Sequence, residues 1–471
     1  MPRRARALLV AALGLVALAW LGVGCATYTD RMQAATTAVE AGAYADGLSA
    51  LNKALRVDSE QELPEHWRSN DPLTVLERGI VLQSLGRYAE SSHDLQAAEQ
   101  EIELLDLRVG AVGALGKYLY SDSAGKYKAP PSERLALNAI NLLNYLARGD
   151  LDGAAVEARR FQTQREYLSN NGLDAPGPAS LGAYLAGVVF EKLGEGDRAL
   201  RYYEEALAGA GPLESLREPV SRLAQRHPYR GPRLEALLAE GAPTAGAGAA
   251  GASATGSATG GRADAPGMGE ILVVTSVGRV PHKVPERLPI GAAIGVAGTI
   301  LTDDLSVLQH SIFKVLVIPA LKPVGSGLSS IAVAVDGEAA PLELVTNLGA
   351  AVAQEYEANK PKIIAAGVSR LVARAAVAEG ARVAGEQAGG SGNLIGALLG
   401  LATEAALVAA DRPDTRSWTM LPGRVLATRM PVPSGAHTVE IAFGDASALP
   451  RRFEVNVAPG GLATVVVTEP R

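Results

Sequence analysis

The chain has only one cysteine, Cys25, among 471 residues, and this scarcity limits how the protein is stabilised. A single cysteine excludes a disulfide bond within the chain. A protein without disulfides relies on the burial of apolar side chains, and a chain of this length buries enough apolar surface to do so. Its length also predicts at least two domains.

The sequence also lacks the short motifs that identify many catalytic and cofactor sites. It contains neither a Gly-x-Ser-x-Gly nucleophile elbow nor a Gly-Lys-Ser/Thr phosphate loop. Its six histidines lie far apart and form no His-x-x-x-His pair, which argues against a metal site. Lysine and arginine form no basic stripe, which argues against nucleic acid as a partner. We therefore predict no catalytic residue, no metal and no cofactor.

The N-terminus has the organisation of an export signal. Three arginines within the first six residues precede an apolar run over residues 7–20, and the small residues Gly22 and Gly24 lead to Cys25. Residues 21–25 resemble a bacterial lipobox, with Gly22 at the usual leucine position. The resemblance implies that residues 1–24 are a signal peptide and that Cys25 becomes the lipidated N-terminus. An uncleaved membrane helix is the alternative, although the apolar run is short for a span.

The residue after the cysteine bears on the final location. Ala26 stands there rather than an aspartate, and similarity to lipoprotein sorting in two-membrane bacteria implies the periplasmic face of the outer membrane. The inner membrane is the alternative. Two or more acyl chains suffice for stable anchoring. Loss of the signal peptide changes the formal net charge from −6 to about −9.

A recurring glycine phrase organises residues 25–240. Each turn glycine stands between two segments with helical apolar spacing, which predicts pairs of helices; these glycines are Gly42, Gly86, Gly149 and Gly194. Small residues precede the turn at Gly79 and Gly187, whereas Leu142 takes that place in the third unit. The pattern resembles the tetratricopeptide repeat, although the glycines lie 44, 63 and 45 residues apart against 34 in that family.

The resemblance implies a concave groove lined by the first helix of each unit. We predict that Gln83, Tyr184, Val188 and Glu191 face this groove and contact a partner. The face is apolar, and an apolar concave face requires a cover. The sequence leaves two covers open: a partner peptide, or the chain's own predicted helix over residues 104–119.

Residues 241–267 consist almost entirely of glycine, alanine, serine and threonine, which predicts a flexible linker. The Gly-Ala-Gly-Ala-Ala-Gly string inside it matches a dinucleotide-binding fingerprint only as letters, because no predicted strand precedes it. Beyond the linker, short runs rich in β-branched residues alternate with Gly and Pro turns, which predicts a β-sandwich-like domain over residues 268–471.

A helical hairpin is predicted to interrupt this β-rich domain at residues 347–410. Residues 347–384 are rich in Ala, Glu, Lys and Arg and form the first helix, with a break near Lys360 as an alternative. Residues 393–410 form a second, more apolar helix. Packing on the sheet is favoured over membrane insertion, because Glu404 lies in the middle of the second helix. The expected fold class is therefore multidomain α+β.

Two further groups of residues have candidate roles. His282 lies in Val-Pro-His-Lys-Val and is either part of an exposed recognition loop or an ordinary histidine of an edge strand. Asp414, Arg416 and Trp418 are expected to form a buried ion pair beneath an aromatic ring that locks the helical hairpin to the sheet, since the arginine fork suits such a pair. A binding role for these residues is the alternative.

Taken together, the chain resembles a family of bacterial outer-membrane lipoproteins that have tetratricopeptide-like repeats followed by a β-rich domain. The phrases that carry the resemblance are 76–79 (Leu-Glu-Arg-Gly), 144–150, 157–160, 269–274, 281–283 and 414–418. The resemblance implies no reaction. We expect a non-enzymatic, lipid-anchored periplasmic adaptor that binds envelope proteins or peptides, and an enzyme with a cryptic active site acting on envelope components is the alternative.

Overall fold

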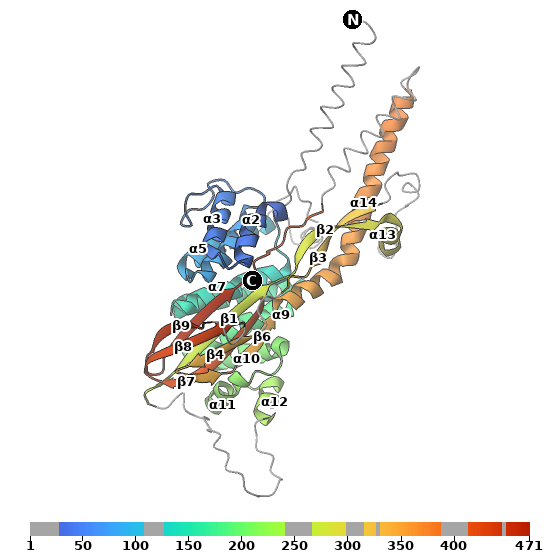
Figure 1. Ribbon diagram of the computed structural model, residues 1–471. Coiled ribbons are helices and arrows are strands. Elements are labelled where there is room, and N and C mark those ends of the chain that lie inside the picture. Colours follow the sequence, from blue (N-terminus) through green and yellow to red (C-terminus); the bar gives the residue numbers. More distant parts are fainter. Residues whose placement is uncertain are drawn as a thin grey trace.

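The computed structural model describes residues 28–107, 127–240, 266–297, 315–325, 330–387, 413–444 and 449–471. The predicted signal peptide, Cys25 and the predicted second helix at residues 393–410 lie outside these ranges, as do nearly all of the predicted linker and most of the predicted helix 104–119. Helices fill the first half of the chain and sheets dominate the second (Figure 1). This arrangement confirms the α+β class.

The first half consists of successive helix pairs. The pairs are α2 (Tyr28–Glu40) with α3 (Tyr44–Leu55), α4 (Asp71–Ser84) with α5 (Tyr88–Leu107), α7 (Pro131–Ala147) with α8 (Leu151–Asn170), and α9 (Pro176–Lys192) with α10 (Gly196–Ala210). A short 3-10 turn, η1 (Glu214–Leu216), and the helices α11 (Arg217–Arg226) and α12 (Pro232–Glu240) follow.

Glycine forms the turn in each helix pair and permits close packing between the helices. The four predicted turn glycines, 42, 86, 149 and 194, have φ values of 74°, 73°, 70° and 78°, a region that side chains other than glycine rarely adopt. Gly79 lies so close to α5 that an added Cβ would be 3.0 Å from the Leu95 side chain. In the third unit the small residue is on the second helix instead, where Gly153 lies against the Tyr145 ring.

The second half contains two four-stranded sheets. The inner sheet has the order β10-β1-β7-β6 and the outer sheet the order β5-β4-β8-β9. The inner strands are β1 (Met268–Arg279), β6 (Glu343–Asn347), β7 (Pro422–Pro433) and β10 (Leu462–Glu469), and the outer strands are β4 (Ile331–Val335), β5 (Glu338–Ala340), β8 (Gly435–Phe443) and β9 (Arg451–Val457). Only the β1–β10 pairing is parallel within these two sheets.

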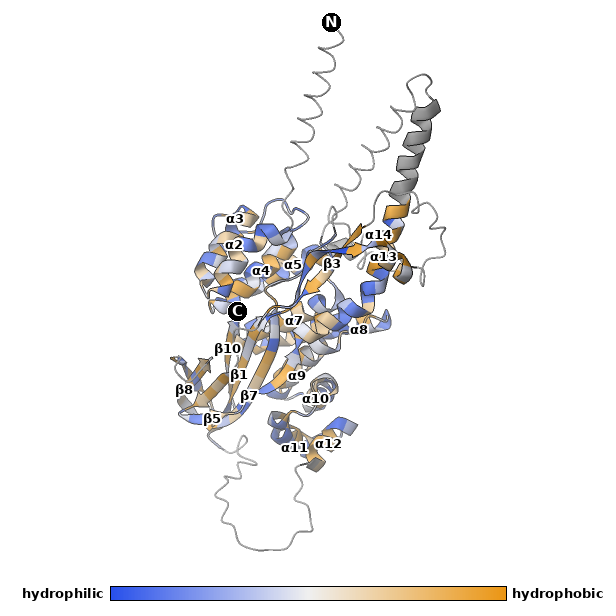
Figure 2. Ribbon diagram, turned by 45° about the vertical axis from the view of Figure 1, so that its right-hand side comes forward, coloured by the Kyte–Doolittle hydropathy of each residue, from blue (hydrophilic) through white to orange (hydrophobic). Residues whose placement is uncertain are grey.

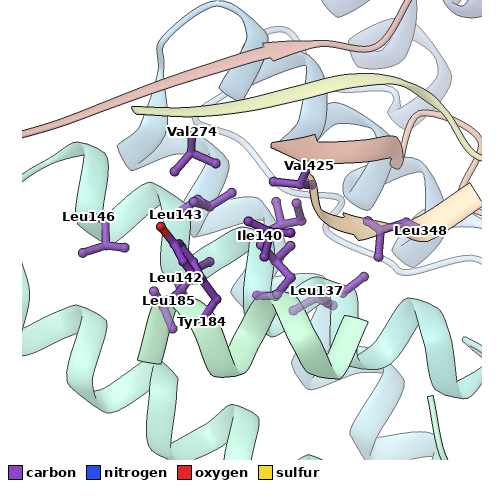
Figure 3. Packing of buried hydrophobic residues seen from close by; sticks show 14 of the residues in the cluster. Leu137, Ile140, Leu142, Leu143, Leu146, Tyr184, Leu185, Val274, Leu348 and Val425 are labelled. Atoms are coloured by element: carbon purple, nitrogen blue, oxygen red, sulfur yellow. The ribbon is translucent and has the colours of Figure 1, made fainter. Parts of the chain in front are cut away.

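The inner sheet is covered on both faces. Ile271 and Val273 of β1 belong to the core between the two sheets, whereas Leu272 and Val274 belong to the core shared with the helices. Figure 3 shows Val274 and Val425 from this sheet beside side chains of α7 and α9. This explains why β1 is buried along nearly its whole length, while β8 and β9 alternate in burial because only one face of the outer sheet is covered.

A third unit, which we call the arm, extends away from the two sheets (Figures 1 and 2). It combines the antiparallel strands β2 (His282–Pro289) and β3 (Val315–Lys322) with α13 (Ile290–Ala297) and α14 (Leu348–Gln387). α14 agrees closely with the predicted helix 347–384 and continues through Pro361 without the break considered near Lys360. Among the helices that the structure describes, none combines the length and apolar composition needed to span a bilayer.

Candidate functional site

The predicted groove residues are buried beneath the inner sheet. Gln83, Tyr184 and Val188 are almost completely inaccessible, and so is the side chain of Glu191. Gln83 accepts a hydrogen bond from the Thr468 hydroxyl of β10 at 2.7 Å. The chain's own sheet therefore covers this face, a cover that neither of the two sequence-based alternatives included. Its strands have two apolar faces, so they require a neighbour on both sides.

His282 has a different environment from the other four predicted contacts. It begins β2, pairs with Lys322 of β3 and is half-buried. Burial, together with the nearby Arg279 and Lys322 cations, lowers its pKa. The structure thus places His282 in a strand of the arm and does not bring it together with the groove residues.

A buried ionic network joins α9 to the inner sheet. Arg429 of β7 donates to Glu191 of α9 at 3.0 Å and to Glu270 of β1 at 2.7 Å, while Lys192 pairs with Glu270. The Tyr203 hydroxyl lies 2.9 Å from the same guanidinium. Burial alone raises the pKa of Glu270, but Arg429 and Lys192 outweigh it and lower that pKa to about 2. The network therefore stays charged and holds the sheet in one register on the helices.

A second junction is built on two buried glutamates, which we call the carboxylate clamp. Glu77 of α4 accepts hydrogen bonds at 2.7 Å from the backbone N–H and the hydroxyl of Thr419 and from the backbone N–H of Met420. The Tyr28 hydroxyl lies 3.4 Å from the same carboxylate. Glu133 of α7 accepts from the backbone N–H of Trp418 at 3.1 Å. Together they bind three consecutive backbone amides of the segment 413–421, which we call the clamped loop.

The clamped loop carries the predicted ion pair. Arg416 donates to both carboxylate oxygens of Asp414, at 2.8 and 2.7 Å, and the Arg416 side chain is buried. Trp418 is fully buried, but the ring over the guanidinium belongs to Tyr127, whose centroid is 6.0 Å away. The ion pair is thus confirmed, and the aromatic ring that covers it comes from the helical half.

Burial dominates the electrostatics of the clamp. It raises the pKa of both Glu77 and Glu133 to about 7, against hydrogen bonds from Thr419, Met420, Tyr127 and Trp418 that lower it. The Glu133 charge also raises the pKa of Glu77, and the Glu355 charge raises that of Glu133. Sequence reasoning missed both residues as site residues. The available signal was a glutamate at a buried position of each first helix.

A third polar cluster lies beside a surface groove between α5 and α8. The groove has a volume of about 310 Å³ and is lined by Glu99, Val156, Arg159, Arg160, Thr163 and Gln164. Behind it, Asn138 donates one amide to both Glu99 and Glu157, at 2.6 and 2.8 Å. Burial, and then the Glu99 charge, raises the pKa of Glu157 to about 7. A carboxyl group with this pKa is suited to proton transfer near neutral pH.

Within the described ranges, no three or more His, Cys, Asp or Glu side chains come together as metal ligands would. Comparison of the chain with protein-family models, with curated proteins and with solved structures finds no match.

Proposed function

We propose that this protein is a lipid-anchored periplasmic scaffold that holds its arm and outer sheet in fixed positions relative to the envelope membrane and binds envelope proteins there. The observation that carries the proposal is the joint between the two halves. A single apolar core, the Arg429 network and the carboxylate clamp fasten the inner sheet to the helices. A scaffold needs such a rigid joint because its binding surfaces must stay in fixed positions relative to its anchor.

The anchor rests on the N-terminal sequence. Cys25 lies three residues before Tyr28, where α2 begins, so an acyl group on that cysteine would hold the helical repeats directly at the membrane. The outer membrane remains the proposed location, on the basis of Ala26. The helix pairs with left-handed turn glycines support the proposed relationship to tetratricopeptide repeats.

The proposed partner surface differs from the predicted groove. Gln83, Tyr184, Val188 and Glu191 contact the inner sheet, so the surfaces left for partners are the outer faces of the helices, the arm, the outer sheet and the edge strand β6 of the inner sheet. Large apolar side chains are exposed on such surfaces, among them Val156 of α8, 54% exposed, and Leu344 of β6, 45% exposed. Partners of unknown identity would be periplasmic or envelope proteins.

Two measurements test this proposal. The Cys25→Ser protein should become extractable from membranes by high salt or accumulate as an uncleaved precursor, whereas a variant that is still processed and resists salt extraction would contradict the anchor. Photocrosslinkers placed at Val156 and Leu344 should capture discrete envelope proteins, and one at the buried Tyr184 should capture none. Absence of any crosslinked protein at the exposed positions would contradict the scaffold.

One observation favours an enzyme as the second candidate. Asn138 bridges Glu99 and Glu157 beside the groove, and the pKa of Glu157, raised to about 7, suits a general acid or base. If this candidate is right, Glu157→Gln fails to complement a deletion of the gene while the crosslinks at Val156 and Leu344 are unchanged. The scaffold proposal expects no phenotype for that substitution beyond its effect on stability.

A further inference from the structure

The arm has a core of its own. Leu316 and Ile318 of β3 pack with Ile364 and Val368 of α14 and with Ala293 and Ala297 of α13. This cluster is separate from the cores of the helices and of the two sheets. Gly367 permits the close packing, since a Cβ there would lie 3.1 Å from the Leu316 side chain. The arm is therefore a small folded unit that presents its outer surface independently.

The outer surface of α13 is apolar and open. The helix, Ile-Gly-Ala-Ala-Ile-Gly-Val-Ala, contains no charged or hydrogen-bonding side chain. Ala292 and Gly295 are exposed, and Ile294 is half-buried. A Cβ placed on Gly291 or Gly295 would meet no atom of the described residues within 4 Å. The neighbouring Val315 at the start of β3 is 45% exposed. Such an apolar surface, exposed at the end of a unit, marks an interaction site.

The charges around this surface are mainly positive. Arg287 of β2 and Lys362 and Arg370 of α14 lie close in sequence to the residues that pack with α13. Lys283 and Lys322 lie at the opposite end of the β2–β3 pair, and Lys360 pairs with Glu357 at 3.5 Å. The acidic residues among the arm's described side chains are Glu286, Glu355 and Glu357, and Glu355 faces inward, where it accepts a hydrogen bond from the Ser132 backbone. The whole chain, in contrast, has a formal charge of −6. The arm thus combines an apolar helix with a local basic excess in an acidic protein.

We propose that the arm binds the surface of an anionic phospholipid bilayer, with α13 lying in the interface and the surrounding lysines and arginines contacting the headgroup phosphates. An apolar helix flanked by basic residues has the composition of an interfacial element. The positive charge near α13 favours an anionic membrane over an apolar protein surface, because anionic lipid lowers the free energy of each basic residue close to it. This contact requires no acyl chain, so it is a second membrane contact, independent of Cys25.

Vesicle flotation of the chain from residue 25 onward, carrying Cys25→Ser, tests the proposal without the acyl anchor. The protein should float with vesicles of phosphatidylethanolamine and phosphatidylglycerol. With vesicles of phosphatidylcholine it should stay in the bottom fractions of the gradient. Added salt should weaken the flotation, since the attraction is partly electrostatic. Equal flotation with both kinds of vesicle, or with neither, would overturn the proposal.

Matched substitutions identify the arm as the contact. Ala292→Asp with Gly295→Asp should reduce the bound fraction about tenfold or more, because both aspartates would face the lipid. The control is Ala236→Asp with Ala239→Asp in α12, two exposed positions with the same spacing in another helix, which should bind as the parent does. Arg287→Glu with Lys362→Glu, both exposed, should reduce binding to anionic vesicles by a similar factor.

Circular dichroism confirms that each variant is folded before flotation. Unchanged binding of the α13 variant, or equal loss in the α12 control, would contradict the proposal. Light scattering without vesicles tests whether a second copy of the chain, rather than a bilayer, covers α13. If the parent is a dimer and the α13 variant a monomer, a second copy of the chain covers this surface and the membrane proposal is wrong.

Discussion

Glu77→Gln is expected to change how the stability of the protein depends on pH. Burial raises the pKa of Glu77 from its ordinary value of 4.5 to about 7, although the Thr419 and Met420 donors lower it. The folded chain therefore binds a proton at Glu77 more tightly than the unfolded chain does. The resulting stabilisation is fully present below about pH 4.5 and is lost as the pH rises through about 7. Glutamine does not titrate, so this dependence disappears in the variant.

The magnitude follows from the two pKa values. A rise from 4.5 to about 7 corresponds to about 3 kcal/mol once the carboxyl group is fully ionised. Between about pH 5 and about pH 8, the free energy of unfolding of the parent should therefore fall by about 2–3 kcal/mol relative to that of the variant. Superimposed on this is a constant cost of about 1–3 kcal/mol, because the glutamine amide cannot accept the third backbone or hydroxyl donor.

Urea unfolding followed by tryptophan fluorescence measures this difference, since Trp418 is fully buried in the clamped loop. Glu235→Gln, at an exposed position of α12, is the control and should run parallel to the parent at every pH. Glu133 titrates in both proteins and leaves the comparison intact. The prediction is refuted if the free energies of unfolding of Glu77→Gln and the parent run parallel with pH, or if the parent becomes more stable relative to the variant as the pH rises. Either result would show that the hydrogen bonds outweigh burial at Glu77.

Three further predictions concern the joint between the helices and the inner sheet. Tyr184→Ala should lower the free energy of unfolding by about 3–5 kcal/mol, because the ring is fully buried; a variant with an unchanged melting temperature and weakened partner binding would restore the predicted groove. Arg429→Met should cost about 3–5 kcal/mol, because the buried Glu191 and Glu270 lose the cation that they share and keep only Arg222 and Lys192, and a more stable variant in thermal melts would refute this interpretation of the network. Limited proteolysis should cut first within residues 241–267, yet the two fragments should co-elute in native gel filtration because they share a core; separate elution would refute that joint.

Local features were the most predictable from the sequence. Gly86 and Gly149 predict helix ends because only a residue without a Cβ adopts their left-handed backbone readily. Val439–Ile441 and residues 453–457 predict strands because they alternate on a sheet with one covered face. These inferences depend on residues within a few positions of one another, where spacing and geometry are directly related.

The central strand β7 was missed for a local reason as well. Pro431 and Pro433 argue against a strand that is paired on both sides, since proline has no N–H to donate. In the structure β6 pairs only with residues 424–427 of β7, so the two prolines lie beyond the end of β6 and need no donor on that side. Their other neighbour is β1, where Pro431 lies opposite Glu270. The prolines thus reflect where β6 ends, which the sequence of β7 alone does not specify.

The carboxylate clamp and the cover of the predicted groove depend on contacts between residues far apart in the sequence. The sequence predicts that the groove needs a cover, but it does not identify the inner sheet as that cover. The first helices were apolar on a face that should have been wet, and the run Ile271–Leu272–Val273–Val274 was apolar on both faces. Each of these apolar faces has to be buried by another part of the protein. In the structure they bury each other, and Leu143 of α7 and Val274 of β1 lie in the same core. This packing also explains Glu77 and Glu133. The backbone amides of the clamped loop are buried against the helices, and the two carboxylates supply the hydrogen-bond acceptors that these amides lose when they are removed from water. Two excess apolar faces in one chain, joined by a linker long enough to let them meet, therefore predict each other better than either predicts an external partner.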